Sequence, residues 1–172
     1  MVQTLAASLI PIDELEHRCG LVEVTDPQFF REWQAVLPEL SVWEQEALDR
    51  LKAGYLSLLK RPPLAENAVR MAMLDPLLFI AGFHIAPFQV KPEKSVTIAL
   101  QDEDGTTIEE RMDVLILKEQ FWLLVIESKR AGIALEEAIA QLLAYMLGSP
   151  DPTRPIFGML TNGGHFLFAK LV

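Results

Sequence analysis

Three charged residues interrupt two apolar runs in the stretch RMDVLILKEQFWLLVIESKR, residues 111–130. Asp113 lies at the start of the first run, and Glu127 and Lys129 close the second. A buried carboxylate is costly unless it is paired or bound to a metal ion. Two carboxylates that converge on one sheet face can bind one cation between them. The alternative is an ion pair, in which Lys129 neutralises Glu127 at a strand end with Asp113 at the sheet margin.

The register of the two runs decides whether the charges converge. We predict an antiparallel hairpin whose loop consists of residues 118–120, so that Asp113 faces Val125 and Glu127 lies diagonally beside Asp113. Lys129 has the same parity as Glu127 and joins them. The residues expected on the opposite face are Trp122, Leu124, Ile126 and Ser128.

Apolar runs and turn residues around the hairpin predict the elements that position it. Residues 64–83 have the pattern of an apolar helix with a kink at Pro76 and an end at Gly82. Residues 95–117 are typical of two strands joined at Asp104-Gly105, and residues 121–129 of a third strand.

A second helix and two further strands complete the pattern. Residues 135–147 are predicted to form a helix closed by Gly148, and residues 154–172 two strands joined by the turn at residues 162–164. The order helix, three strands, helix, strand, strand predicts an α/β domain with a central mixed sheet flanked by helices.

The first part of the chain is predicted to be a helical extension. Residues 1–60 would pack on a core of residues 61–172, the whole forming one compact domain. Asp26 followed by Pro27 predicts the start of one helix. Ser41 and Glu44, at capping-box spacing, predict a second helix. The apolar stripe expected to face the core is Trp43, Leu48, Leu51, Tyr55 and Leu58.

Composition argues against a membrane protein, a secreted protein and a disulfide-linked protein. The 172 residues have no apolar run near the roughly 20 residues of a membrane helix, and the N-terminus lacks the basic start of a signal peptide. We therefore expect a cytoplasmic protein without membrane contact. Cys19 is the single cysteine, which excludes an internal disulfide and a CxxC metal site. The net charge of −9 divides into −7 for residues 1–50 (ten acids, three bases) and −2 for residues 51–172 (fourteen acids, twelve bases).

The charged residues resemble the motif of the PD-(D/E)XK nuclease superfamily. Asp113 is followed, after thirteen residues, by the triplet Glu127-Ser128-Lys129, and Met112 stands in the place of the Pro of the motif. The order of elements resembles the superfamily core as well. The resemblance covers about residues 60–172. It is closest to the N-terminal nuclease domain of type I restriction R subunits, although no GxxxxGK[ST] helicase motif accompanies it.

Three further residues resemble the same branches of the superfamily. Gln141 and Tyr145 have QxxxY spacing in the second helix, a motif of the RecB-like and type I restriction R-subunit branches. Glu66 matches the acid that these branches carry in the upstream helix.

The resemblance implies a restriction-endonuclease-like core (αβββαβ) and a Mg²⁺-dependent DNA endonuclease, with Mn²⁺ as a substitute metal. Asp113, Glu127 and the backbone carbonyl of Ser128 would bind the metal, and Glu66 would reach it through water. Lys129 would stabilise the attacking hydroxide or the transition state, and Gln141 would point towards the scissile phosphate. The implied partners are DNA and restriction or helicase subunits.

Two expectations follow from charge and apolar content. The 51% of hydrophobic residues and the need for two sites to cut a duplex predict a homodimer. The acidity and the lack of a basic helix allow an alternative, a non-catalytic module of the same fold that binds a protein or nucleic acid. Asp113, Glu127 and Lys129 argue against it, because a lost activity removes the need for these charges.

Overall fold

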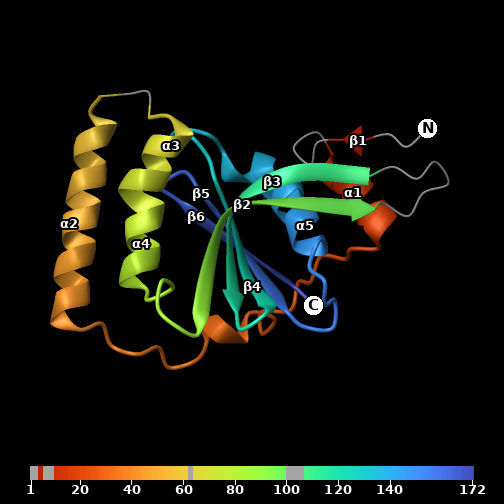
Figure 1. The fold of residues 1–172 in the computed structure, drawn as a ribbon, viewed down its shortest axis with the longest axis horizontal. Coiled ribbons are helices and arrows are strands. Elements are labelled where there is room, and N and C mark those ends of the chain that lie inside the picture. The colour runs from red at the N-terminus through yellow and green to blue at the C-terminus, as the bar shows by residue number, and fades with distance from the viewer. Residues whose placement is uncertain (1–3, 6–9, 62–63, 100–106) are drawn as a thin grey trace.

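A mixed six-stranded β-sheet runs through the molecule, and helices cover both of its faces (Figure 1). The computed structural model describes residues 4–5, 10–61, 64–99 and 107–172. The strands are β1 (Thr4–Leu5), β2 (Phe88–Ala99), β3 (Thr107–Lys118), β4 (Phe121–Ser128), β5 (Ile156–Thr161) and β6 (Phe166–Leu171). The predicted turn at Asp104-Gly105 lies outside the described residues.

Strand β3 is the centre of the sheet. It pairs antiparallel with β2 from end to end, antiparallel with β4 over residues 114–118, and parallel with β1 at residues 107–108. Strands β4 and β5 are parallel, and β5 and β6 are antiparallel. The predicted mixed sheet is therefore confirmed, with β2 starting at Phe88 rather than near residue 95.

The helices are α1 (Ile12–Cys19), α2 (Val42–Leu59), α3 (Glu66–Val69), α4 (Asp75–Ile80) and α5 (Ile139–Leu147), with 3-10 turns η2 (Arg31–Trp33) and η4 (Leu135–Ala138) and the π-turn η3 (Arg70–Leu74). Segments α3, η3 and α4 follow one another directly and form the helix predicted over residues 64–83. Its π-turn precedes Pro76, whose ring lacks an N–H and would clash with a regular preceding turn. Gly82 ends the helix with a φ of 78°.

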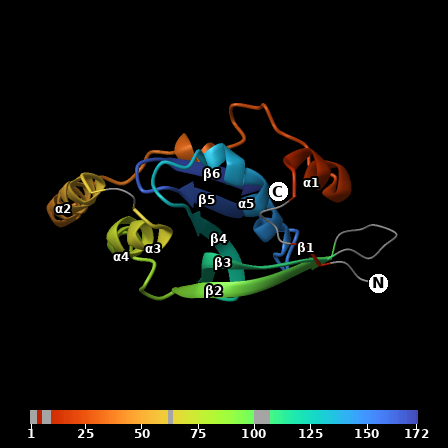
Figure 2. The ribbon, with the colours of Figure 1, turned by 90° about the horizontal axis from the view of Figure 1, so that it is seen from above.

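The sheet separates two apolar clusters. On one face, Leu142 and Tyr145 of α5 and Leu15 of α1 pack with Leu115 and Val125. On the other face, Leu74 and Leu78 pack against residues that include Val114, Ile116 and Ile126. The two views place α2 outside α3 and α4, on the side away from the sheet (Figures 1 and 2). The layers are therefore α5 with α1, the sheet, α3 with α4, and α2.

The N-terminal segment departs from the prediction. The helix predicted from Asp26 is not formed, because the Asp26 carboxylate accepts a hydrogen bond from the Gln28 N–H and holds a turn, which is followed only by η2. Helix α2 begins with the predicted capping box of Ser41 and Glu44. Of its predicted apolar stripe, Tyr55 is buried, whereas Trp43 and Leu58 are exposed, because α2 contacts the molecule mainly through α4 and η3. No helix in the described part of the chain is both long and apolar enough to cross a membrane.

Candidate active site

The hairpin of β3 and β4 brings Asp113 and Glu127 together, but not by the predicted route. Lys118 pairs with Phe121, so the loop holds two residues, Glu119 and Gln120, instead of three. Leu123 is the extra residue of a β-bulge, since Leu117 pairs with Trp122 and Ile116 with Leu124. The bulge shifts the register by one residue and restores the parity that a two-residue loop would lose.

The corrected register changes the neighbour of Asp113. Because Val114 pairs with Ile126, the next position places Asp113 directly opposite Glu127, not opposite Val125. The Asp113 N–H lies 3.4 Å from Glu127 Oε2. The bulge also places Trp122 in the cluster of the α5 face and leaves Leu124 in the other cluster, so these two residues do not share a face as predicted.

Ser128 holds the carboxylate of Asp113 by two hydrogen bonds. Its backbone N–H donates to Asp113 Oδ2 at 2.7 Å, and its side-chain hydroxyl donates to the same oxygen. The prediction that Ser128 turns away from the charges is wrong, because the last position of β4 lies beside Asp113 and its hydroxyl can reach across. Ser128 is fully buried, which fixes the orientation of the carboxylate.

A chain of polar side chains runs from Glu127 into helix α5. Lys129 Nζ donates to Glu127 Oε1 at 2.8 Å and to Gln141 Oε1 at 2.6 Å. The Gln141 amide nitrogen donates to the Tyr145 hydroxyl at 2.7 Å, and that hydroxyl lies 3.3 Å from the carbonyl oxygen of Arg111. Gln141 and Tyr145 are one turn apart in α5, so both reach the same end of the sheet.

Backbone contacts fix the chain where it leaves β4. The Lys129 N–H donates to the carbonyl of Thr161 at 2.7 Å, next to the parallel pair of Ser128 and Thr161. Lys129 is therefore anchored by its main chain on β5 and by its side chain on α5. Thr161 was not predicted as part of the site, and its position at the end of an apolar strand gives no signal in the sequence.

The carboxyl groups of the site influence one another electrostatically. Burial, then the charge of Asp113, raises the pKa of Glu127 to about 7, although Lys129 opposes the shift. Partial desolvation, then Asp113, also raises the pKa of Glu66, and Lys129 again opposes it. The negative charges of Asp113, Glu127 and Glu66 thus act on one another at the end of the sheet. Lys129 alone does not compensate them.

The donor set fits a hard divalent ion such as Mg²⁺ only in part. In the described residues, no three His, Cys, Asp or Glu side chains are grouped closely enough to hold a metal. Mg²⁺ takes few protein ligands and keeps several waters, so a pair of carboxylates such as Asp113 and Glu127 is compatible with it. Glu66, at the N-terminal end of α3, is near enough to influence Glu127 electrostatically but does not complete a group of three.

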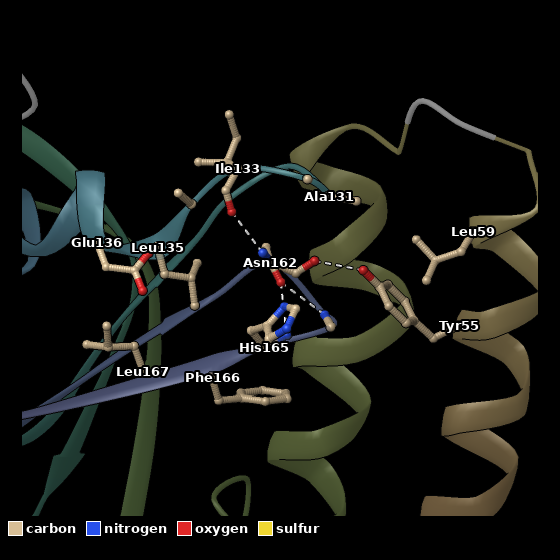
Figure 3. A pocket seen from close by; sticks show the side chains of 13 residues that line it. Tyr55, Leu59, Ala131, Ile133, Leu135, Glu136, Asn162, His165, Phe166 and Leu167 are labelled. Carbon is tan, nitrogen blue, oxygen red and sulfur yellow. Dashed lines mark hydrogen bonds between the residues drawn. The ribbon is translucent and has the colours of Figure 1, made fainter.

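A pocket of about 620 Å³ lies beside this end of the sheet, between α2, the loop of residues 131–135 and the turn between β5 and β6 (Figure 3). Asp113, Glu127 and Lys129 are not among the residues that line it. The Asn162 side chain is used in structure: it donates to the Ile133 carbonyl and accepts from the N–H groups of Gly164 and His165. The pocket therefore contains none of the predicted site residues.

Comparison with known proteins agrees with the resemblance seen in the sequence. The family model of the type I restriction enzyme R protein N terminus (HSDR_N) matches residues 88–171, which contain β2 to β6 and α5. No curated protein and no solved structure gives a significant match. The match covers just under half of the chain, and it shows that residues 88–171, which include Asp113, Glu127, Lys129 and Gln141, are similar to the family of type I restriction enzyme R protein N termini.

Proposed function

We propose that this protein is a Mg²⁺-dependent DNA endonuclease with a type I restriction R-subunit-like nuclease domain of the PD-(D/E)XK kind. The observation that carries the proposal is the polar chain from Glu127 through Lys129 to Gln141, next to Asp113, within the residues that match the family. A simple ion pair would not need Gln141. Gln141 is a buried amide on an otherwise apolar face of α5, and a requirement to orient the Lys129 side chain would account for it.

The roles of the residues follow from phosphodiester hydrolysis. Asp113, oriented by Ser128, and Glu127 supply two hard oxygen ligands on adjacent strands. Mg²⁺ bound there supplies a Lewis acid that neutralises phosphate charge and lowers the pKa of a bound water. Lys129 places its ammonium where the attacking hydroxide or the pentavalent phosphate develops negative charge. Gln141 accepts from Lys129 and thereby directs it, and Glu66 adds negative charge that favours the metal.

The direct test is nicking of supercoiled plasmid by the pure protein with Mg²⁺, and with Mn²⁺ in parallel. We expect relaxed plasmid with either metal, none in EDTA, and none with Asp113→Ala. Asp151→Ala is the matched control, since Asp151 is an aspartate of the same protein that pairs with Arg154 at the other end of the sheet. If neither plasmid nor single-stranded DNA is cut with either metal, the activity is absent and the protein is a nuclease-fold module that binds a partner or nucleic acid.

Partners are part of the proposal. The match to a restriction enzyme family supports DNA and other restriction subunits as partners, and we include a helicase subunit in the proposal. We also propose a homodimer, because two sites are needed to cut both strands of a duplex. Light scattering at tens of micromolar protein measures this directly, and a monomeric mass would restrict the activity to nicking or to single strands.

A further inference from the structure

Arg111 lies two residues before Asp113 on β3, and its backbone and side chain have different surroundings. Its carbonyl lies 3.3 Å from the Tyr145 hydroxyl, which belongs to the polar chain that holds Lys129. Its side chain is 63% exposed, and the guanidinium lies 3.0 Å from the carboxylate of Glu93, itself 60% exposed. Arg111 therefore presents a cation in water from a main chain that is fixed beside the carboxylates.

The partner of this cation has an unusual backbone. Pro92 pairs with Val114 and Lys94 with Met112, which places Glu93 opposite Asp113. In a regular antiparallel pair, opposite side chains share a face, so Glu93 would add another carboxylate beside Asp113. Instead Glu93 has a φ of 53°, a left-handed conformation that is unfavourable for a residue other than glycine.

The ion pair with Arg111 does not explain this conformation. Exposed ion pairs contribute little to stability, so this contact does not offset the strain of the backbone. Strained backbone conformations are common at ligand-binding and active sites. In this conformation the Glu93 carboxylate contacts the Arg111 guanidinium, and the contact is exposed and weak enough to be exchanged.

We propose that Arg111 binds a DNA phosphate next to the scissile phosphodiester and that this phosphate replaces Glu93 as the partner of the guanidinium. This inference rests on the proposed nuclease function. A guanidinium binds phosphate through two parallel hydrogen bonds, a stronger contact than an exposed carboxylate provides. The site needs such a cation, because Asp113, Glu127 and Glu66 repel an anionic backbone and the chain carries a net charge of −9.

The charge of Glu93 then affects the affinity for DNA. While Glu93 pairs with Arg111, it competes with DNA for the guanidinium. This competition weakens DNA binding. Loss of the Glu93 charge must therefore strengthen binding, but only when Arg111 is present to use it.

The test measures the affinity of a short fluorescein-labelled DNA duplex by anisotropy in EDTA, where no cleavage occurs. The variants are Arg111→Gln, Glu93→Gln and the double variant. A matched control exists in the Arg154–Asp151 pair, whose atoms are 3.3 Å apart. Arg154 is exposed, Asp151 is half-buried, and Arg154 lies over the ring of Phe121 at the opposite end of β4. Arg154→Gln and Asp151→Asn make the same changes of charge far from the site.

We expect Arg111→Gln to weaken binding about tenfold and to reduce the slope of log affinity against log salt by about one, as for one lost phosphate contact. Glu93→Gln should strengthen binding about two- to fivefold in the wild-type background and have no effect in the Arg111→Gln background. The Arg154 and Asp151 variants should change affinity less than twofold.

Two results would overturn the assignment. Equal effects of Arg111→Gln and Arg154→Gln on DNA affinity would mean that only net charge matters. If Glu93→Gln strengthened DNA binding in the Arg111→Gln background as well, Glu93 and phosphate would not exchange as partners of Arg111. Plasmid nicking separates this failure from that of the proposed function. If the wild type nicks plasmid but Arg111→Gln binds DNA normally, only the Arg111 contact is wrong. If the wild type neither nicks nor binds DNA, the nuclease proposal falls with it.

Discussion

Lys129 donates a hydrogen bond of 2.6 Å to the side-chain oxygen of Gln141, although one residue follows a strand and the other lies in a helix. Gln141 in turn donates to the hydroxyl of Tyr145. An amide that gives its nitrogen to Tyr145 must present its oxygen to Lys129. The tyrosine therefore sets the orientation of the amide, and the amide sets the direction of the lysine.

Gln141→Leu should reduce DNA cleavage about 10–100-fold while leaving Mg²⁺ affinity within about twofold, because it removes a residue that directs Lys129 but no metal ligand. Tyr145→Phe, which keeps the amide but frees its orientation, should cause a smaller loss. Plasmid nicking rates and calorimetric metal titration measure the two effects. Gln45→Leu, at an exposed glutamine of α2, is the control. Parallel losses of cleavage and metal binding would show that Gln141 shapes the whole site.

Ser128→Ala should weaken Mg²⁺ binding about tenfold, because Asp113 keeps the backbone hydrogen bond but loses the hydroxyl that orients its Oδ2. Calorimetric titration with Mg²⁺ measures the change, and Ser57→Ala on the exposed face of α2 is the matched control. Unchanged Mg²⁺ affinity together with a lower melting temperature would mean that Ser128 stabilises the fold but does not orient Asp113 for metal binding.

The sequence predicted that Asp113, Glu127 and Lys129 lie together, but not the strand register that brings them together. The positions of Asp113, Glu127 and Lys129 at the ends of apolar runs indicate that they share a place in the sheet. The bulge at Leu123 has no signal, because Phe121 to Ile126 is uniformly apolar and any of these residues can be the extra one. The predicted three-residue loop still placed Asp113 and Glu127 on the same face of the sheet. The reason is that the two-residue loop and the one bulge residue together also leave three residues unpaired.

Contacts that depend on the tertiary structure were not predictable. The Ser128 hydroxyl reaches Asp113, and the Thr161 carbonyl holds Lys129, only after two strands distant in sequence lie side by side. Local signals did better: the capping box of Ser41 and Glu44 and the helix end at Gly82 were correct. The helix expected from Asp26 failed because the same cap residue also stabilises a turn, and a short exposed segment lacks the packing that would favour a helix.

Stability without metal should fall as the pH rises through the range of Glu127. Its pKa is raised from 4.5 to about 7 in the folded protein, so the folded state binds more protons than the unfolded state between these values. The free energy of unfolding in EDTA should therefore decrease between about pH 5 and pH 7, by no more than about 3 kcal/mol. Urea unfolding across this range measures it. Glu127→Gln should flatten most of the dependence, and an unchanged slope would assign it to other groups.

Two glycines with positive φ differ in what a side chain would meet. At Gly163 (φ 84°) an added Cβ would lie 2.3 Å from the Tyr55 hydroxyl, whereas at Gly132 (φ 90°) it meets nothing within 4 Å. Gly132→Ala should cost about 1 kcal/mol from the backbone alone, and Gly163→Ala about 2–4 kcal/mol because Tyr55 must also move. Tyr55 then loses its 2.7 Å hydrogen bond to the Asn162 carbonyl. Equal costs from urea unfolding would mean that α2 shifts freely against the β5–β6 turn.

Lys129→Ala and Asp113→Asn separate a catalytic site from an ion pair. Asp113→Asn removes a ligand charge, so Mg²⁺ binding and cleavage should be lost together. Lys129→Ala removes a positive charge next to Glu127, so at pH 8 Mg²⁺ should bind as well or better, while cleavage falls by orders of magnitude.

The same variant has a different result if Lys129 only neutralises Glu127. A buried carboxylate that loses its partner destabilises the fold, by roughly 3 kcal/mol at a pH where it is ionised. In a nuclease site Mg²⁺ offsets this loss, because an ion that binds only the folded state raises the melting temperature. Melting curves of Lys129→Ala at pH 8, with EDTA and with millimolar Mg²⁺, therefore decide between the two. A variant that melts lower than the wild type and does not respond to Mg²⁺ has an ion pair where we propose a catalytic lysine.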